Sequence, residues 1–494
     1  MKARLLILSL AALFLFTCES SKKKADDNGG GSANNKVVSA SDVTPPPNDT
    51  PDQKPSDGGG TGEKPKDTAT STPTSTSAPA EIKTGQSSLK FEMTSTASSA
   101  QIKALAQNAN SFSFKIYGKI AEGVKNGNVF ISPLSIRTAF ALLYPATKAG
   151  KKSFDEISSV LTFDKNQENF YRDMKGYLIE LSKFFDQKIK DARYEWSLVN
   201  RVWVDQSFDL NQKYLDVIKV NYNSSVGILD FHTSPEPSRL SINKFVEEST
   251  KSMIKDLLPE GSIKQNTSVV LTNSVYMLAD WLYPFPSSKN EGLFKTDSGE
   301  SLTVPVMTQT ASVPFFKGTG YKAVSLPYVG DKIAMLIVLP DAGKAVSDFE
   351  KTVTQKMFNE EITAGLAAKQ VEITMPKFTF TFGSVSIKES LSALGLVESF
   401  KPTENHFPDL LQKDGKPVSD TVYIQDVFHQ AKVVVDEKGT EAAAATAIVV
   451  GATSSGINNQ KPETFIVDHP ALFYIYDKTY GSILFMGRLA NPKI

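Results

Sequence analysis

Cysteine is almost absent from this chain of 494 residues, because Cys18 is the only one. The chain can therefore form no internal disulfide bond, and a zinc site built from several cysteines is excluded. The four histidines are scattered and form no cluster with metal-ligand spacing. We expect no structural metal.

Net charge and catalytic motifs are also missing. The 54 basic side chains balance 54 acidic ones, so nothing in the charge points to a nucleic-acid partner. The sequence has no G-x-S-x-G elbow, no H-E-x-x-H pair and no dinucleotide fingerprint. We therefore expect no cofactor, and a hydrolase is the least favoured class of protein.

The beginning of the chain has the pattern of an export signal. Basic residues precede an apolar run, residues 5–16, that is shorter than the ~20 residues of a membrane-spanning helix. The following segment, LFTC at residues 15–18, resembles a bacterial lipobox. We expect a signal peptide over residues 1–17 and a lipid on Cys18. The protein would then be exported and anchored to a membrane, at the cell surface or in the periplasm; ordinary signal cleavage beside an incidental cysteine is the alternative.

A long polar segment follows. Residues 19–89 are built mainly of Gly, Ser, Thr, Pro, Asp and Lys, a composition that cannot bury enough apolar surface to fold. We predict that residues 18–94 form a disordered tether that spans roughly 45 Å root-mean-square. No second linker appears beyond it, so residues 95–494 are predicted to form one folded domain.

Helical patterns come first in that domain, and mixed strands and helices follow, which predicts an α+β fold. Apolar residues recur at helical spacing in residues 105–122 and 135–143. Segments rich in β-branched and aromatic residues predict strands. The predicted strands are residues 268–277, 333–339, 371–382, 431–436, 464–467, 472–476 and 483–489.

The most unusual stretch is EKGTEAAAATAIVV, residues 437–450. Its alanines favour a helix and its end favours a strand, so a short surface helix that runs into a strand is one interpretation. Read as a strand with a period of two, however, the segment has one face of small or uncharged side chains. The only charge after Gly439 lies on the other face. The first face carries Thr440, Ala442, Ala444, Thr446, Ile448 and Val450. Such a segment could enter between two strands, with Gly439 as a pivot.

Four motifs resemble the serpin family in order and spacing. EKGTEAAAAT (437–446) resembles the hinge of the reactive-centre loop, and the longer stretch FHQAKVVVDEKGTEAAAA (428–445) runs into it. NVFISPLSIRTAFALL (128–143) resembles the helix beneath the central sheet. LTNSVYMLADWLYPF (271–285) resembles a strand with its tryptophan, and residues 468–492 resemble the C-terminal signature. The resemblance implies the serpin fold, with a large, mostly antiparallel central sheet, surrounding helices and an exposed reactive-centre loop.

The resemblance also implies a function. A serpin is an inhibitor that a target serine protease attacks as a substrate; once cut, the loop inserts into the central sheet and distorts the protease. We expect a monomer whose partner is such a protease. A non-inhibitory, surface-binding lipoprotein with the same fold is the main alternative, and an adhesin is a second one. The absence of bulky or charged residues from the inward hinge face favours inhibition.

Site residues follow from the same resemblance. Ser132, Asn273 and His429 match the polar cluster called the shutter, and Trp281 matches the tryptophan where the loop enters the sheet. The expected reactive bond joins Thr453 to Ser454, and a one-residue slip would place Ala452 before the cut instead. The small residues before this bond suit an elastase-like protease, and Lys461 is a weaker candidate cut site. We expect the hinge to be exposed before cleavage. The hinge residues are Glu437, Gly439, Thr440, Glu441, Ala442, Ala443, Ala444 and Ala445.

Overall fold

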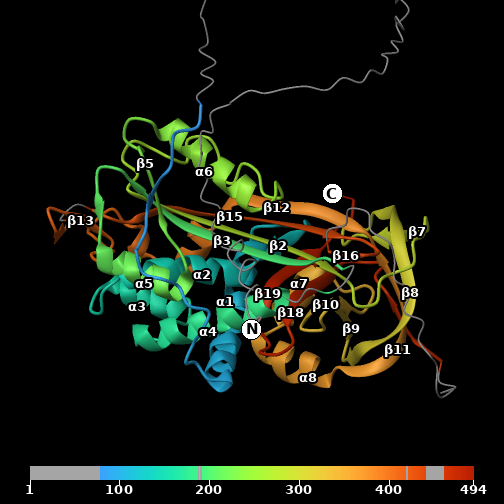
Figure 1. Cartoon of the computed structure of the whole chain (residues 1–494). Helices are drawn as coiled ribbons and strands as arrows, with labels where there is room; N and C mark the ends of the chain where they lie inside the picture. Colours follow the sequence, from blue (N-terminus) through green and yellow to red (C-terminus); the bar gives the residue numbers. More distant parts are fainter. Residues whose placement is uncertain (1–77, 187–188, 190–191, 419–420, 441–460, 494) are drawn as a thin grey trace, which may run out of the picture. The chain divides into compact units, whose positions relative to one another are not determined.

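Helices and two large sheets organise the part of the chain that the computed structural model describes, residues 78–186, 189, 192–418, 421–440 and 461–493 (Figure 1). This is the expected α+β arrangement. The helices are α1 (Ser99–Glu122), α2 (Pro133–Leu143), α3 (Lys152–Val160), α4 (Gln167–Phe185), α5 (Gln212–Tyr222), α6 (Pro235–Ser249), α7 (Val346–Thr352), α8 (Thr363–Gly365) and α9 (Lys388–Ala393).

In the part of the chain that the structure describes, the central sheet has seven strands, and the start of the hinge lies in its middle. The strand β6 pairs parallel with β15, while β16 pairs antiparallel with both of them at one end. The pair β3–β5 is also parallel, and the remaining pairs are antiparallel. In spatial order the strands are β1 (Lys83–Gly85), β5 (Val226–Leu229), β3 (Tyr194–Asp205), β6 (Val269–Asp280), β16 (Gly439–Thr440), β15 (Ile424–Val435) and β12 (Phe378–Ser386).

A second sheet of nine strands packs beside the central one. Its order is β17 (Glu463–Ile466), β11 (Ala367–Pro376), β8 (Ser301–Gly318), β9 (Tyr321–Pro327), β10 (Ile333–Pro340), β18 (Ala471–Asp477), β19 (Ile483–Leu489) and β2 (Val129–Ile131), and β7 (Glu291–Lys295) pairs with β8. A small third sheet joins β14 (Lys416–Pro417), β13 (Leu411–Lys413) and β4 (Asp209–Leu210).

One predicted strand is wrong. Residues 371–382 form two strands, β11 and β12, which belong to different sheets. The break lies at Lys377, where the chain crosses from the nine-stranded sheet to the central one. The apolar alternation continues across this crossing because both strands bury one face, so the sequence pattern alone does not reveal the break.

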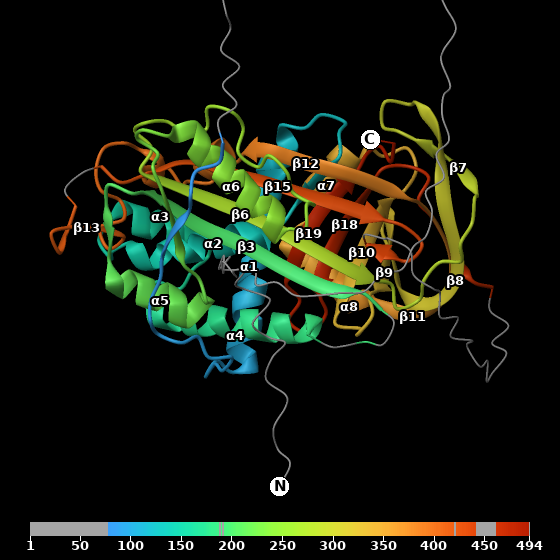
Figure 2. The same ribbon diagram turned by 45° about the horizontal axis from the view of Figure 1, so that its top comes forward.

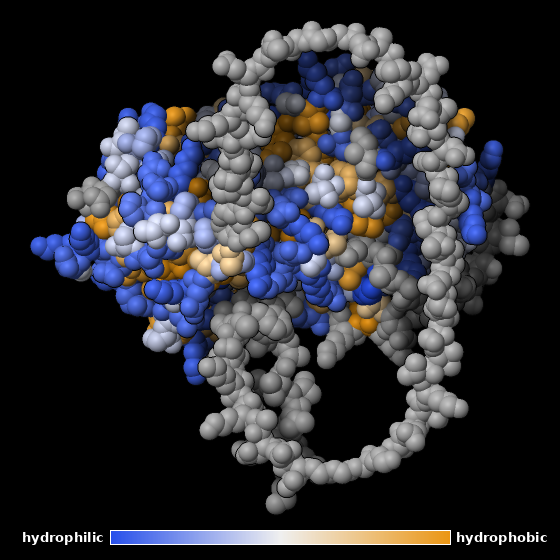
Figure 3. Space-filling view, turned by 90° about the horizontal axis from the view of Figure 1, so that it is seen from above, coloured by the Kyte–Doolittle hydropathy of each residue, from blue (hydrophilic) through white to orange (hydrophobic). Residues whose placement is uncertain are grey.

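The two faces of the central sheet are covered differently (Figure 2). One face, here called the inner face, packs against α2 in one half, where α1 joins the same hydrophobic cluster, and against the second sheet in the other half. The outer face is covered by α6 and the segment that follows it. The face in Figure 3 mixes hydrophilic and hydrophobic side chains. Among the described residues, the large hydrophobic side chains that stay exposed are Leu89, Met93, Tyr283, Leu293, Val397 and Ile466.

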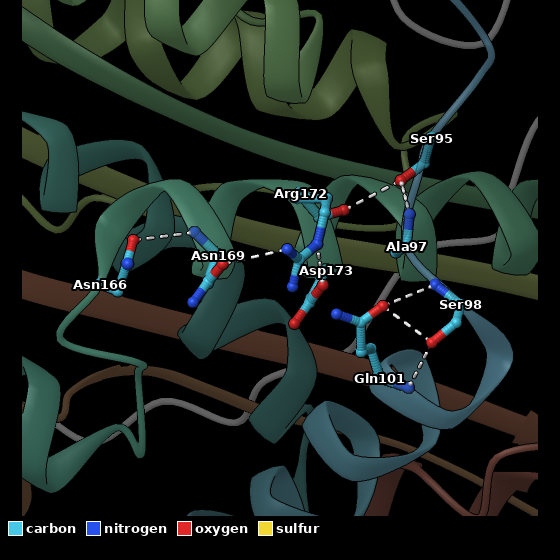
Figure 4. Close-up of polar contacts among 8 residues, drawn as sticks. All are labelled: Ser95, Ala97, Ser98, Gln101, Asn166, Asn169, Arg172 and Asp173. Atoms are coloured by element: carbon cyan, nitrogen blue, oxygen red, sulfur yellow. Dashed lines mark hydrogen bonds and ion pairs between the residues drawn. The ribbon is translucent and has the colours of Figure 1, made fainter.

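Local capping explains where the first two helices begin. Ser98 caps α1 through a capping box: its Oγ accepts a hydrogen bond from the backbone of Gln101, and the Gln101 side chain accepts one from the Ser98 backbone (Figure 4). Ser132 caps α2 by accepting a hydrogen bond from the Ser135 backbone at 3.2 Å, and Pro133 occupies the first turn. The cap of α2 thereby places Ser132 directly beneath the central sheet.

Part of the segment that the composition predicts to be disordered is folded. Residues 83–85 form β1 at the edge of the central sheet, and Ala80 and Ile82 pack against the hydrophobic cluster under α6. These residues lie within the range 18–94, for which the composition predicts a disordered tether. The polar composition hides this, because one half-buried isoleucine and a three-residue strand give almost no periodic signal.

Candidate functional site

The hinge enters the central sheet through a tight turn after β15. The backbone amides of Lys438 and Gly439 donate hydrogen bonds to Asp436 Oδ1, at 2.9 and 3.3 Å. The amide of Asp436 donates to the carbonyl oxygen of Gly439 at 3.0 Å. The turn reverses the chain, so that Gly439 and Thr440 become β16 between β6 and β15.

Gly439 is required for this close approach. A Cβ atom at that position would lie 2.1 Å from the carbonyl oxygen of Ala279 on β6, closer than any side chain tolerates. The glycine is therefore a contact point between backbones as well as a pivot.

Thr440 is buried rather than exposed, which corrects the expectation for the first residue after the pivot. It is 4 % exposed, and its Oγ1 shares a hydrogen bond of 2.7 Å with the hydroxyl of Tyr328. The reason is long-range: Thr440 pairs with Ala279, a residue far away in the sequence. The start of the hinge is thus already part of the sheet in the uncleaved chain.

Trp281 lies against this docked hinge, as the resemblance implies. Its indole stacks on Tyr328 with ring centroids 4.5 Å apart, and its Nε1 donates a hydrogen bond of 2.9 Å to the carbonyl oxygen of Asp436. Its backbone amide donates to the carbonyl oxygen of Lys438 at 2.6 Å. Trp281 and Tyr328 together hold the hinge turn in place through these contacts.

Glu437 is fixed by a partner that sequence reasoning did not find. Lys377 Nζ lies 2.5 Å from Glu437 Oε1, and the amide of Phe285 donates to the Glu437 carbonyl oxygen at 2.8 Å. Partial burial opposes ionisation of Glu437, but the hydrogen bond and the charge of Lys377 leave its pKa below the ordinary value. Lys377 stands at the crossing between the two sheets, so no local pattern marks it.

The structure brings Ser132, Asn273 and His429 together under the middle of the sheet. The amide of Ser132 can only donate, so His429 Nε2 accepts its hydrogen bond at 3.2 Å. His429 Nδ1 therefore carries the proton and donates to Asn273 Oδ1 at 2.7 Å. Burial lowers the pKa of His429 to about 4, so the ring is neutral at physiological pH. This hydrogen bond joins β15 to β6 at the register pair His429 and Asn273.

The cluster extends to residues that sequence reasoning missed. Asn273 Nδ2 donates to Ser135 Oγ at 2.7 Å and to Asn200 Oδ1 at 3.0 Å. Asn200 in turn donates to Thr138 Oγ1 at 2.5 Å. Ser135 and Thr138 lie on α2, so the network ties the helix to both β3 and β6. Their helical spacing from Ser132 was the only sequence signal that could have found them.

Several predicted site residues lie outside the described residues. These are the lipidation candidate Cys18, the hinge residues Glu441, Ala442, Ala443, Ala444 and Ala445, and the reactive bond Thr453–Ser454. Within the described ranges, no helix is both long and apolar enough to cross a membrane, and no group of acidic residues, histidines or cysteines is placed to hold a metal ion.

Comparison with known proteins gives a consistent result. A family model described as Serpin (serine protease inhibitor) matches residues 107–492. An uncharacterized serpin-like protein of Thermococcus kodakarensis is 33% identical over 397 residues, which cover 80% of this chain and 87% of that protein. Human antithrombin-III is 31% identical over 401 residues, covering 80% and 83%, and the leukocyte elastase inhibitor of Xenopus laevis is 31% identical over 396 residues, covering 78% and 99%.

Solved structures agree on the fold. The native state of tengpin, a thermophilic serpin, aligns with a TM-score of 0.69 at 22% identity and covers 82% of this chain and 97% of its own. Thyroxine-binding globulin in complex with thyroxine aligns with a TM-score of 0.67 at 23% identity, covering 79% and 100%. At 22% and 23% sequence identity, the two structures support the fold and do not indicate the function. With the family match over most of the chain and the hinge docked between β6 and β15, the chain belongs to the serpin family.

Proposed function

We propose that this chain inhibits serine proteases by inserting its cleaved loop into the central sheet. The protease serine attacks the carbonyl carbon of Thr453, the amine of Ser454 leaves, and an acyl ester joins the loop to the protease. Insertion of the loop then carries the protease away before water can hydrolyse the ester. The observation that carries the proposal is the docked hinge, since Gly439 and Thr440 already occupy the first two positions of such a strand.

The register of β16 defines where the rest of the loop would go. Gly439 and Thr440 oppose Asp280 and Ala279 on β6, and Thr440 opposes Val435 on β15. Continuing one residue per step on each side would place Thr446 opposite both Asn273 and His429. These two residues are themselves paired in the uncleaved chain. The two registers therefore agree on one path for the loop, and that path passes through the shutter.

The side chains along that path fit the proposal. The inward positions 442 and 444 would oppose Met277 and Val275 on β6, which are 6 % and 2 % exposed and belong to the apolar core. Alanine at both positions adds no bulk and no charge there. The single glutamate of this stretch, Glu441, would face outward.

Insertion would replace one parallel strand interface by two antiparallel ones. The direct β6–β15 pairing and the His429–Asn273 hydrogen bond must break, and the new strand would pair antiparallel with both neighbours. Antiparallel pairing is slightly more stable per residue, and each added hydrogen bond contributes roughly 0.5–1.5 kcal/mol net. The uncleaved sheet is thus poised to gain stability once the loop is free to enter.

The loop is long enough to move the protease from one end of the sheet to the other. The register would pair Val450 with Val269, the first residue of β6, and Thr453 would lie beyond that end. Residues 440–453 span about 46 Å at about 3.3 Å per residue. This distance exceeds the diameter of a small domain, which is about 30 Å.

A panel of serine proteases tests the proposal. The chain without its N-terminal segment, residues 19–494, is mixed with elastase-like, trypsin-like and chymotrypsin-like enzymes, and the products are separated after boiling in detergent. We expect a one-to-one covalent complex with an elastase-like enzyme, because Ala452 and Thr453 offer small side chains to the specificity pocket. Cleavage of the loop without any covalent complex would support the alternative, a non-inhibitory serpin that binds another molecule at a surface.

We also propose that Cys18 carries a lipid that anchors the protein to a membrane. The cysteine lies where the apolar run ends, and no other cysteine is available for acylation. A Cys18→Ala variant should move from the membrane fraction to the soluble fraction. If the variant still partitions into detergent as the parent does, the proposal that Cys18 carries the anchor is wrong.

A further inference from the structure

The segment before α1, here called the strap and defined as residues 80–98, is attached to four parts of the domain. In Figure 2 it is the blue chain that passes α6 and the edge of the central sheet and reaches α4.

The upper end of the strap holds the first turns of α6. The amide of Ala80 donates a hydrogen bond to the carbonyl oxygen of Pro237 at 3.2 Å. Ser241 Oγ donates to the carbonyl oxygen of Ala80 at 2.6 Å. Ala80 and Ile82 also pack against the hydrophobic cluster between α6 and the sheet. The strap thus adds both polar and apolar contacts to this helix.

The middle of the strap extends the sheet and reaches the same helix from below. The strand β1 pairs with β5, and Thr84 Oγ1 accepts a hydrogen bond of 3.1 Å from Arg201 Nη2. The Arg201 guanidinium lies over the rings of Trp203 and of Phe245 on α6, at 4.8 and 4.7 Å from their centres. Thr84 is the hydrogen-bond partner of a buried arginine that packs against α6.

The lower end of the strap is tied to α5 and α4. Ser87 Oγ donates a hydrogen bond of 2.5 Å to Asp216 on α5, and Lys175 on α4 lies 5.1 Å from the ring centre of Phe91. Ser95 Oγ donates to the carbonyl oxygen of Arg172 on α4 at 3.0 Å (Figure 4). The strap therefore links α6, at its upper end, to α5 and α4, at its lower end.

The helix that the strap holds covers the place where the sheet must open. The cluster under α6 includes Val270 on β6 and Phe428 on β15, the two strands that insertion would separate. It also includes Ile242 and Val246 on α6. Continuing the hinge register would bring residues 447 and 449 beside Phe428 and Val270. A new strand at that depth has to disturb the packing of α6 on the sheet.

We propose that the strap holds α6 on the sheet and thereby slows insertion of the cleaved loop. The second half of this statement rests on the proposed inhibitory function. The contacts of the strap affect the rate of loop insertion, because every contact that keeps α6 in place has to be lost or strained while the loop enters. Weakening the strap should speed insertion, and it should not affect the acylation chemistry at the loop.

The test uses the full-length chain and two matched variants. Ile82→Asp places a charge against the α6 cluster, whereas Leu89→Asp makes the same change at an exposed position of the same strap, where the side chain is 47 % exposed. Hydrogen exchange of peptides from residues 235–249 reports how often α6 opens, and it needs no protease. We expect exchange about tenfold faster in Ile82→Asp than in the parent, since partial loss of one isoleucine contact changes an opening equilibrium by about that factor. Leu89→Asp should match the parent.

A second arm measures insertion itself. An arginine at position 444 would face the core during insertion and should slow it, so that most cleaved molecules release active protease. Adding Ile82→Asp to Ala444→Arg should raise the fraction of protease that is trapped severalfold, and adding Leu89→Asp should leave it unchanged.

The outcomes test the strap and the proposed inhibitory function separately. Unchanged α6 exchange in Ile82→Asp overturns the proposal, and so does faster exchange without any gain in trapping. If the parent itself forms no covalent complex with any protease, the proposed function fails; the exchange result then still decides whether the strap holds α6, and equal exchange in all three proteins contradicts it.

Discussion

Under the proposed mechanism, replacing Ala444 by arginine should turn the protein from an inhibitor into a substrate. The hinge register would set residue 444 opposite Val275 on β6 and Ala431 on β15, which are 2 % and 0 % exposed. Both belong to the apolar cluster between the two sheets. The arginine would therefore have to be buried without a partner for its charge when the loop inserts.

The size of the effect follows from that burial. The penalty for burying an unpaired ion in a protein is several kcal/mol, and we take about 4 kcal/mol. If half of it is present at the transition state, insertion slows by about 30-fold, since each 1.4 kcal/mol is a factor of ten. Deacylation would then overtake insertion. The variant should be cut at the same bond as the parent, release active protease and gain little thermal stability after cleavage.

The matched control is Glu441→Arg. It carries the same side chain at an outward position that already bears a charge, so trapping should remain close to that of the parent. The assay counts moles of inhibitor consumed per mole of protease inactivated, and it compares melting temperatures before and after loop cleavage. If Ala444→Arg traps protease as efficiently as Glu441→Arg, residue 444 does not enter the core and the register is wrong. Thr440→Arg is a poorer probe, because Thr440 is already buried in the uncleaved chain.

Three further predictions concern the hinge, the shutter and the loop. The pKa of His429 is depressed to about 4 in the folded state, below its ordinary value of about 6.5. Its contribution to stability is therefore complete above pH 6.5, and about 3 kcal/mol of it is lost as the pH falls toward 4. Urea unfolding at pH 7 and 4.5 should show a smaller pH dependence of stability in His429→Gln than in the parent, and equal pH dependence would contradict this. Gly439→Ala should expel β16 from the sheet, because the new Cβ would lie 2.1 Å from the Ala279 carbonyl oxygen. The fluorescence of Trp281, which lies beside the hinge, should then change. An unchanged emission spectrum would show that the hinge tolerates a side chain. Mass spectrometry of the peptide released by an elastase-like protease should give a fragment that begins at Ser454, whereas a start at Pro462 would move the reactive bond.

The sequence was most informative where several motifs lie in order. The serpin fold could be predicted from four of them, together with the residues of the shutter, because each motif is long and carries its own side chains. Ser132, Asn273 and His429 do meet in the structure, and Trp281 does lie beside the hinge. Local patterns also predicted strands close to β6, β10, β18 and β19.

Features that depend on distant partners could not be predicted. The burial of Thr440 depends on pairing with Ala279 and on the hydroxyl of Tyr328. The role of Lys377 depends on where the chain crosses between two sheets. The strap was missed because Ile82 gains its importance from a cluster under α6 that is assembled from remote parts of the chain. In each case the deciding contact joins residues whose proximity no local periodicity reveals.

The crystal structure of the loop-cleaved protein tests the central claim most directly. Our account predicts that residues 439–450 form one strand between β6 and β15, with Thr446 between Asn273 and His429 and the hydrogen bond between those two side chains broken. If the cleaved protein instead keeps the direct β6–β15 pairing, with His429 Nδ1 still 2.7 Å from Asn273 Oδ1, the loop does not insert and the proposed mechanism is wrong.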